Sequence, residues 1–144
     1  MKVIDHGHSG VEQFLISRAI LDAITAHCMA DKSIESCGLV GGRGELALSF
    51  YPTHNIAADP SHNFLIDPKD QLDAFKTMRS KSEELLAIVH SHPNSPATPS
   101  PTDLKTAAYP GTVYLIVSLM ETEVSFGSFV FETTGFREVT MDIL

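Results

Sequence analysis

The chain contains few cysteines, and their positions exclude several classes of metal site. Cys28 and Cys37 are the only two, and they do not form a C-x-x-C pair. A structural zinc finger or a zinc-dependent deaminase needs more thiolates in tighter pairs. The H-E-x-x-H pattern of the commonest zinc peptidases is also missing. Cys37 could act as a nucleophile, but no base is implied near it, so we interpret it as a small buried residue.

Basic residues and long apolar runs are also scarce. The chain has 10 Lys and Arg against 18 Asp and Glu, a net charge of −8 at pH 7, whereas a nucleic-acid binder normally carries a basic stripe. No apolar run approaches the roughly 20 residues of a membrane helix, and residues 1–8 lack the apolar stretch of a signal peptide. We therefore expect a cytoplasmic protein that binds neither nucleic acid nor membrane. At 43% hydrophobic content, residues 1–144 should form a single domain.

One segment carries the ligands that a catalytic metal would need. The sequence His90-Ser91-His92-Pro93 is followed after six residues by Ser100-Pro101-Thr102-Asp103. The apolar run before it, residues 85–89, is typical of a buried strand that Pro93 would end. Because alternate residues of a strand point to one face, the two histidines should project together. Two imidazoles and one carboxylate suit a catalytic zinc, which commonly takes three protein ligands and leaves the fourth position to water.

The same residues also have a purely structural interpretation. Ser100 is a good helix N-cap, Pro101 suits the first helical position, and Asp103 suits the first turn. The prolines of this stretch could mark a solvated linker, and two histidines at a strand end are often only polar rim. The combined pattern is expected by chance in about 1 in 10⁵ sequences of this composition. The two interpretations are also compatible, because a capped helix would hold Asp103 within bonding distance of a metal.

The pattern resembles the signature of the JAMM (MPN-plus) metallopeptidases, which joins an upstream Glu to H-[ST]-H-P-x6-S-x2-D. Residues 35–42, E-S-C-G-L-V-G-G, are similar to the upstream E-x-C-G-L-L-x-G segment of that family. The likeness extends from about residue 17 to residue 130. It is greatest with the small stand-alone bacterial members, which resemble sulfur-carrier-protein cysteine hydrolases and share Asn55, Phe64 and Asp67-Pro68.

This resemblance implies one zinc ion per chain, with three protein ligands: His90, His92 and Asp103. Glu35 would be the general acid/base, and Ser100 would support the bound water and the oxyanion. Asn55 would contact the substrate or the oxyanion. On spacing alone Glu35 is the weakest assignment, because it lies far upstream of the histidines and an isolated Glu is usually a solvated surface residue.

The reaction that the resemblance implies is hydrolysis of an amide or isopeptide bond at the C-terminal glycine of a ubiquitin-like or sulfur-carrier protein with a Gly-Gly tail. Zinc lowers the pKa of bound water to about 7, and one carboxyl group can take a proton from that water and give it to the leaving nitrogen. The alternative is a non-catalytic MPN-type scaffold that only binds partners, although such scaffolds usually lack part of the ligand set. A small-molecule amidohydrolase would use the same ligands, since these define the reaction better than the substrate.

The apolar patterns predict an α+β fold. Helices are expected from residue 18 to about 30, from 68 to about 80, with Leu72 and Phe75 on its inner face, and from 101 to about 108. Strands are expected at 12–16, 37–40, 46–51, 64–66, 85–90, 113–118, 124–131 and 136–141. Residues 41–44, G-G-R-G, should form the turn between the second and third strands. A mixed sheet flanked by helices results, in agreement with the curled, mostly antiparallel JAMM/MPN (cytidine-deaminase-like) sheet that the resemblance implies.

Overall fold

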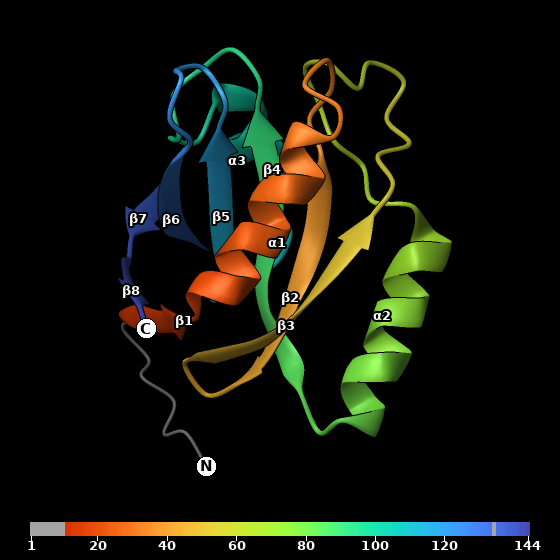
Figure 1. Cartoon of the computed structure of the whole chain (residues 1–144), viewed down its shortest axis with the longest axis vertical. Helices are drawn as coiled ribbons and strands as arrows, with labels where there is room; N and C mark the ends of the chain where they lie inside the picture. The colour runs from red at the N-terminus through yellow and green to blue at the C-terminus, as the bar shows by residue number, and fades with distance from the viewer. Residues whose placement is uncertain (1–10, 134) are drawn as a thin grey trace.

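One mixed sheet and three helices make up the part of the chain that the computed structural model describes, residues 11–133 and 135–144 (Figure 1). The helices are α1 (Arg18–Met29), α2 (Pro68–Ser80) and α3 (Pro101–Thr106). The strands are β1 (Gln13–Ile16), β2 (Cys37–Arg43), β3 (Leu46–Thr53), β4 (Glu84–His92), β5 (Val113–Ser118), β6 (Ser125–Glu132), β7 (Gly135–Glu138) and β8 (Thr140–Ile143). The predicted α+β class is confirmed.

The sheet curls, so that strands at its two ends belong to one continuous stretch of chain. The strand order is β7-β6-β5-β4-β2-β3-β1-β8, and the end strands β7 and β8 are joined by Val139 alone. Val139 donates its backbone N–H to the carbonyl of Ser128 and accepts a hydrogen bond from the Ser128 hydroxyl. Near the middle of the sheet, β4 is antiparallel to β2 and parallel to β5. The strand that carries both histidines is therefore supported on both sides.

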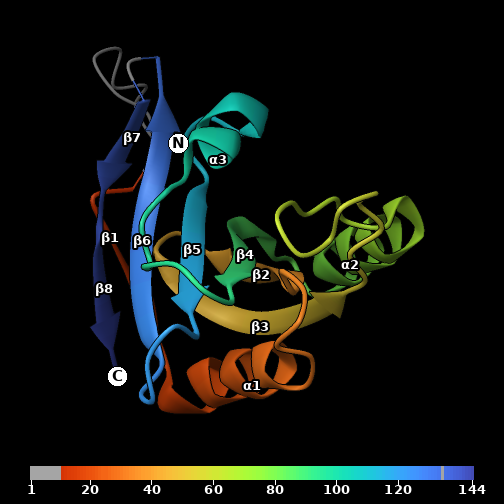
Figure 2. The ribbon, with the colours of Figure 1, turned by 90° about the horizontal axis from the view of Figure 1, so that it is seen from above.

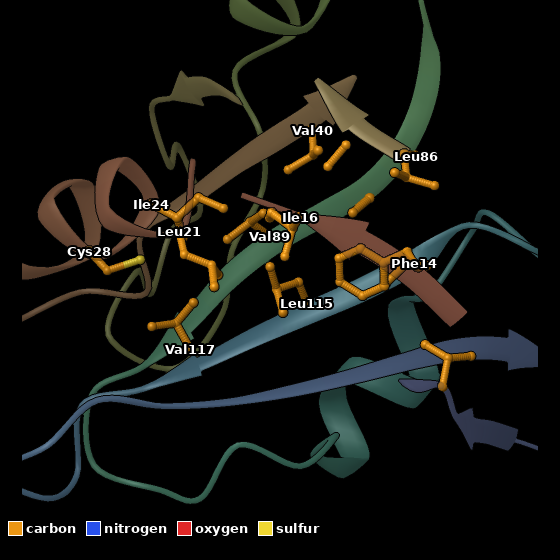
Figure 3. Close-up of a cluster of buried hydrophobic side chains, with 14 of the residues drawn as sticks. Phe14, Ile16, Leu21, Ile24, Cys28, Val40, Leu86, Val89, Leu115 and Val117 are labelled. Atoms are coloured by element: carbon orange, nitrogen blue, oxygen red, sulfur yellow. The ribbon is translucent and has the colours of Figure 1, made fainter. Parts of the chain in front are cut away.

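Successive side chains of β4 point to opposite faces of the sheet and pack in two different hydrophobic clusters. Ala87 and Val89 join the cluster that packs against α1, where Val89 faces residues of that helix (Figure 3). Ile88 joins the second cluster, on the side of α2. His90 and His92 continue the row of Ile88, because strand side chains alternate with a period of two. They therefore lie on the face of the sheet that α2 and α3 share, opposite α1 (Figure 2).

α1 forms because its first turn is capped and one of its faces is apolar. The Ser17 hydroxyl accepts the backbone N–H of Ile20 at 3.2 Å, which satisfies one of the free donors of the first turn. The face turned toward the sheet is apolar, and three of its residues are completely buried: Leu21, Ile24 and Cys28. Burial of an aliphatic side chain of this size contributes roughly 1.5–3 kcal/mol, so α1 is anchored mainly by packing.

α2 begins as predicted, but its buried face is different. Asp67 is the N-cap and accepts the backbone N–H of the second helical residue. Leu72 is 53% exposed, so its predicted place on the inner face is wrong. Ala74 and Met78 are the buried residues, and Phe75 packs partly buried against the same cluster. The helix therefore contacts the sheet through this face and not through Leu72.

β2 continues through the segment that was predicted to be a turn. Gly41 and Gly42 pair with both neighbouring strands, and the chain reverses at Gly44, which has a φ of +59°. A Cβ on Gly41 would collide with the carboxylate of Glu83, and one on Gly42 would collide with the backbone carbonyl of Leu46. These two glycines therefore allow close approach inside a bulged sheet, and only Gly44 serves the turn.

Three other boundaries differ from the prediction. Residues 64–66 do not form a strand, and only Ile66 makes an isolated bridge, with Asn55. The expected strand at 136–141 is interrupted at Val139, where the chain leaves β6 and joins β1. α3 ends at Thr106, earlier than predicted. None of the helices in the described residues is both long and apolar enough to cross a membrane.

Replacing Gly41 by alanine should destabilise the protein. The new methyl group would displace the Glu83 carboxylate, which accepts hydrogen bonds from the hydroxyls of Ser49 and Tyr51 at 2.7 Å. Overpacking of this kind costs about 1–3 kcal/mol, measurable as a lower midpoint in urea unfolding. Gly44→Asn is the control, because Asn tolerates a positive φ and nothing lies within 4 Å of that position. Equal loss of stability in the two variants would contradict this account of Gly41.

Candidate metal centre

The site forms where β4 ends and α3 begins. Pro93 has no backbone N–H to donate to a sheet, and β4 ends immediately before it at His92. The predicted stop at Pro93 is confirmed, although the strand continues two residues beyond the expected end at residue 90. α3 begins at Pro101 behind the N-cap Ser100, whose hydroxyl accepts the backbone N–H of Asp103 at 3.1 Å. In return, the Asp103 carboxylate accepts the backbone N–H of Ser100 at 2.9 Å. This capping box fixes the carboxylate against the end of the strand.

Three side chains of the kinds that bind metals converge at this point. His90 Nε2 and His92 Nε2 lie 3.1 Å apart. Asp103 Oδ1 lies 3.2 Å from His90 Nε2, and its Oδ2 lies 3.1 Å from His92 Nε2. All three residues are buried. A tetrahedral zinc with bonds of about 2.0–2.1 Å holds its ligand atoms about 3.3 Å apart, so the structure is consistent with a zinc site.

The pKa values of the three side chains favour replacement of the protons between Asp103 and the imidazoles by a metal cation. Burial lowers the pKa of His90, which keeps its imidazole neutral as a ligand must be. Burial opposes the charged form of His92 too, but hydrogen bonding to Asp103 and the Pro96 carbonyl outweighs it and raises the pKa. Burial alone would raise the pKa of Asp103, yet the hydrogen bonds to both imidazoles hold it well below its usual range. The carboxylate therefore stays ionised beside the imidazoles, where a cation could replace the shared protons.

Glu35 reaches the same site through the pairing of β2 with β4. The pairing continues beyond the ladder, where the backbone N–H of Ser91 donates to the carbonyl of Ser36 at 2.9 Å. The backbone N–H of Ser36 donates in turn to the Ser91 hydroxyl at 2.8 Å. If this antiparallel register is continued by one residue beyond Ser36 and Ser91, Glu35 lies opposite His92. The sheet therefore brings together residues that the sequence separates widely.

The carboxyl group of Glu35 is buried and partly unsatisfied. The residue is 8% exposed, and among the described residues its Oε1 has no hydrogen-bond partner. Burial raises the pKa of Glu35 to about 7, while the charges of His92 and Asp103 act on it in opposite directions. A group with a pKa near neutrality can both accept and return a proton. Its environment is one that functional carboxyl groups commonly have.

Ser100 and Asn55, the two other predicted residues, have defined structural partners. The Ser100 hydroxyl accepts from Asp103, and its own proton can still be donated to an acceptor in the site. The Asn55 amide nitrogen donates to the carbonyls of Glu35 at 2.8 Å and Asn63 at 2.9 Å. The Asn55 oxygen accepts two backbone N–H groups of the same loop. Asn55 thus holds the loop between β3 and α2, and its contact with a substrate stays a prediction.

Two contacts around the imidazoles were not predicted. His92 Nδ1 lies 2.7 Å from the carbonyl oxygen of Pro96. The ring of Phe64 stacks on that of His90, with centroids 4.4 Å apart and planes inclined by 16°. Both partners come from irregular segments, which periodicity does not place. The only available signal was that the small bacterial members of the resembling family share Phe64.

A cavity of about 580 Å³ opens beside the metal-type ligands, and both His90 and Asp103 line it. Its remaining wall is mainly apolar and comes from the loop before α2, the strands β4 and β5, and the segment after α3. The large apolar and aromatic side chains of this wall are Phe64, Leu65, Ile66, Ile88, Tyr109 and Tyr114. An apolar cavity with a few convergent polar groups is the usual form of a ligand site.

A second group of metal-type residues lies at the surface. His54 Nδ1 is 2.8 Å from Asp70 Oδ2, and the His54 side chain is 85% exposed. Asp70 also accepts the backbone N–H of His54, and Asp67 caps α2. These contacts already account for the side chains, and water screens exposed charges. The buried cluster is therefore the stronger candidate for a metal.

Comparison with known proteins decides the family. A family model for prokaryotic homologues of the JAB domain matches residues 17–130. The chain belongs to this family. A solved protein of Desulfitobacterium hafniense, 33% identical, superimposes with a TM-score of 0.83 over 91% of this chain and 92% of that one. The predicted JAMM resemblance and its curled mixed sheet are confirmed.

Two curated relatives have names that describe cleavage of protein conjugates. A probable TtuB-protein conjugate cleaving protease of Thermus thermophilus is 36% identical over 103 residues, which are 72% of this chain and 68% of the relative. A CysO-cysteine peptidase of Mycobacterium bovis is 31% identical over 112 residues, 76% of each chain. The chain is thus a JAB-family protein related to metallopeptidases, with a buried His-His-Asp cluster that is consistent with zinc.

Removing one ligand should abolish zinc binding. Purified wild-type protein, dialysed against a weak chelator, should retain about one zinc ion per chain, as expected for a site with three protein ligands and a fourth position left to water. His92→Ala and Asp103→Ala should retain essentially none, measured by atomic emission. His54→Ala is the matched control, since it removes a histidine of the exposed group. Loss of zinc in His54→Ala with retention in His92→Ala would place the metal at the exposed group and contradict the buried site.

In metal-free protein, Glu35→Gln should increase stability at neutral pH but not in acid. The pKa of Glu35 is about 7 in the folded protein against an ordinary value of 4.5. The unfolded chain therefore releases this proton first, and wild-type stability falls as the pH rises from about 4.5 to about 7. Thermal unfolding in EDTA should show the variant's advantage above about pH 7 and none below about pH 4.5.

The control for this pH dependence is Glu45→Gln, which neutralises an exposed carboxylate in the β2–β3 turn. Its melting temperature should follow that of the wild type across the same range. Parallel curves for wild type and Glu35→Gln would show that the Glu35 carboxyl ionises as it does in water.

Proposed function

We propose that the protein is a zinc-dependent hydrolase of amide or isopeptide bonds at the C-terminal glycine of a ubiquitin-like or sulfur-carrier protein. The observation that carries this proposal is the buried convergence of His90, His92 and Asp103 beside the Glu35 carboxyl group. The names of two relatives, one for TtuB-protein conjugates and one for CysO-cysteine, support this class of substrate.

Zinc would be held by the Nε2 atoms of His90 and His92 and by the Asp103 carboxylate. When bound, zinc supplies a Lewis acid that lowers the pKa of water to about 7 and polarises a carbonyl group. The capping box holds Asp103 in place, and the contacts of the two imidazoles with Pro96 and Phe64 limit their rotation. The protein thus presents the three ligands with little reorganisation, which is the condition for a precise site.

Glu35 would move the proton. With a pKa of about 7, its carboxylate can take a proton from the attacking water and return it to the leaving nitrogen. The backbone carbonyl of Glu35 accepts a hydrogen bond from the Asn55 side chain, and its backbone N–H donates to the carbonyl of Pro60 at 2.7 Å. These two hydrogen bonds fix the backbone at Glu35. The Ser100 hydroxyl would donate its proton to the developing oxyanion.

The cavity beside the ligands supports a substrate that ends in small residues. A Gly-Gly end has no side chains to collide with His90 and Asp103, which line the cavity. Residues upstream of it would then occupy the apolar cavity of about 580 Å³. Leu65 and Tyr109 line this cavity and are 56% and 40% exposed, so they are free to contact the carrier protein.

Glu35→Gln should keep zinc and lose turnover. The amide preserves the shape of the side chain but cannot accept the proton of water, and loss of a general acid/base typically costs about 10²–10⁴-fold in kcat. The measurement is hydrolysis of a carrier protein with a Gly-Gly end, joined either to cysteine or to a lysine side chain, followed by mass spectrometry. Zinc content is determined on the same samples.

Glu45→Gln serves again as the matched control and should cleave like the wild type. Retained turnover in Glu35→Gln would remove this residue from the mechanism. A wild-type protein that binds zinc but cleaves neither conjugate would overturn the proposed substrate class.

A further inference from the structure

The two imidazoles of the site are oriented by different means. His92 is restrained through Nδ1, which contacts the carbonyl of Pro96 at 2.7 Å. The corresponding atom of His90 is buried and has no hydrogen-bond partner among the described residues. An imidazole that binds a metal through Nε2 carries its proton on Nδ1, and a hydrogen bond from that proton normally sets the ring orientation. His90 lacks this device.

The imidazole of His90 is instead stacked against an aromatic ring. Phe64 lies nearly parallel to the imidazole, at 16° and 4.4 Å between centroids. In this arrangement, rotation of the imidazole about its Cβ–Cγ bond would drive its edge into the face of the phenyl ring. Stacked rings contribute about 0.5–1.5 kcal/mol beyond the area they bury, enough to favour one orientation of His90.

The position of Phe64 is itself fixed by Asn55. The Asn55 amide nitrogen donates to the carbonyl of Asn63 at 2.9 Å, and its oxygen accepts the N–H of Leu65 at 3.0 Å. One side chain therefore holds the residues on both sides of Phe64. The same amide donates to the carbonyl of Glu35 at 2.8 Å. The phenyl ring is thus placed by a hydrogen-bonded loop that is also tied to the segment of the proposed acid/base.

We infer that Phe64 is a positioning residue for the metal ligand His90, and that its stacked ring replaces the missing hydrogen bond at Nδ1. Phe64 does not touch the metal or the reacting atoms in this role. It limits rotation of the His90 imidazole, so that Nε2 stays directed toward the point where the three ligands converge. The inference depends on the role of His90 as a metal ligand, which the loss of zinc in ligand variants tests separately.

The test is zinc affinity, measured by competition with a fluorescent chelator. Phe64→Leu keeps an apolar side chain but removes the ring, and loss of an orienting partner typically weakens metal binding about 10–100-fold. Phe64→Tyr keeps the ring and should restore the affinity to within a few-fold of wild type. The electronic spectrum of the Co²⁺-loaded protein should change in Phe64→Leu and not in Phe64→Tyr, since it reports ligand geometry.

Phe75→Leu is the matched control for general packing. Phe75 is also partly buried against the cluster beside α2, and it does not line the cavity. Thermal unfolding in EDTA should show that Phe75→Leu destabilises the metal-free protein about as much as Phe64→Leu does. The Phe75→Leu variant should nevertheless keep the zinc affinity of the wild type. Affinity is compared at a temperature at which all metal-free variants are folded.

Three outcomes would overturn the inference. Equal zinc affinity in wild type and Phe64→Leu would show that His90 needs no aromatic support. Equal weakening in Phe64→Leu and Phe75→Leu would assign the effect to packing in general. Wild-type protein that binds no zinc would overturn the metal centre and this inference together, whereas zinc binding without hydrolysis would overturn only the proposed function.

Discussion

The antiparallel register between β2 and β4 is the constraint on which the rest of the site depends. It fixes Glu35 opposite His92 through the paired backbones of Ser36 and Ser91. A shift of one residue would turn both histidines toward the α1 face and leave an apolar side chain in their place. The register is held by burial on both faces of β4, where Ala87 and Val89 meet one cluster and Ile88 meets the other. The hydrophobic core therefore sets the geometry of the polar site.

The cost of this arrangement is a concentration of buried polar groups. Glu35, His90, His92 and Asp103 are all buried at one end of the sheet, where an unpaired charge is destabilising. Proton sharing between the carboxylate of Asp103 and the imidazoles offsets part of that cost, and a divalent cation would offset more. The raised pKa of Glu35 reflects the remaining, uncompensated part. Burial therefore disfavours the ionised form of Glu35 and gives the proposed acid/base a pKa near neutrality.

The irregular loop between β3 and α2 supports the site from one side. Asn55 binds backbone groups on both sides of Phe64 and also the carbonyl of Glu35. The family resemblance implies that Asn55 contacts the substrate or the oxyanion, because the family has an asparagine near the site. Periodicity says nothing about loops and does not predict these backbone contacts. Phe64 was expected in a short strand, yet the structure uses it as a stacking surface. Such contacts depend on how a loop folds back, which local patterns do not encode.

Local sequence patterns were enough to predict the convergence of His90, His92 and Asp103, the capped start of α3 and the stop of β4 before Pro93. These features depend on neighbours in the chain: the period of two in a strand, the missing N–H of Pro93, and the hydroxyl of Ser100. Long-range pairing, by contrast, makes Gly41 and Gly42 part of a bulged strand and splits the expected strand 136–141 at Val139. The tertiary structure also places Phe64 on His90 and Glu35 opposite His92. These outcomes required contacts between distant segments, because close packing and sheet curvature, and not local preference, select among the conformations that the chain could adopt.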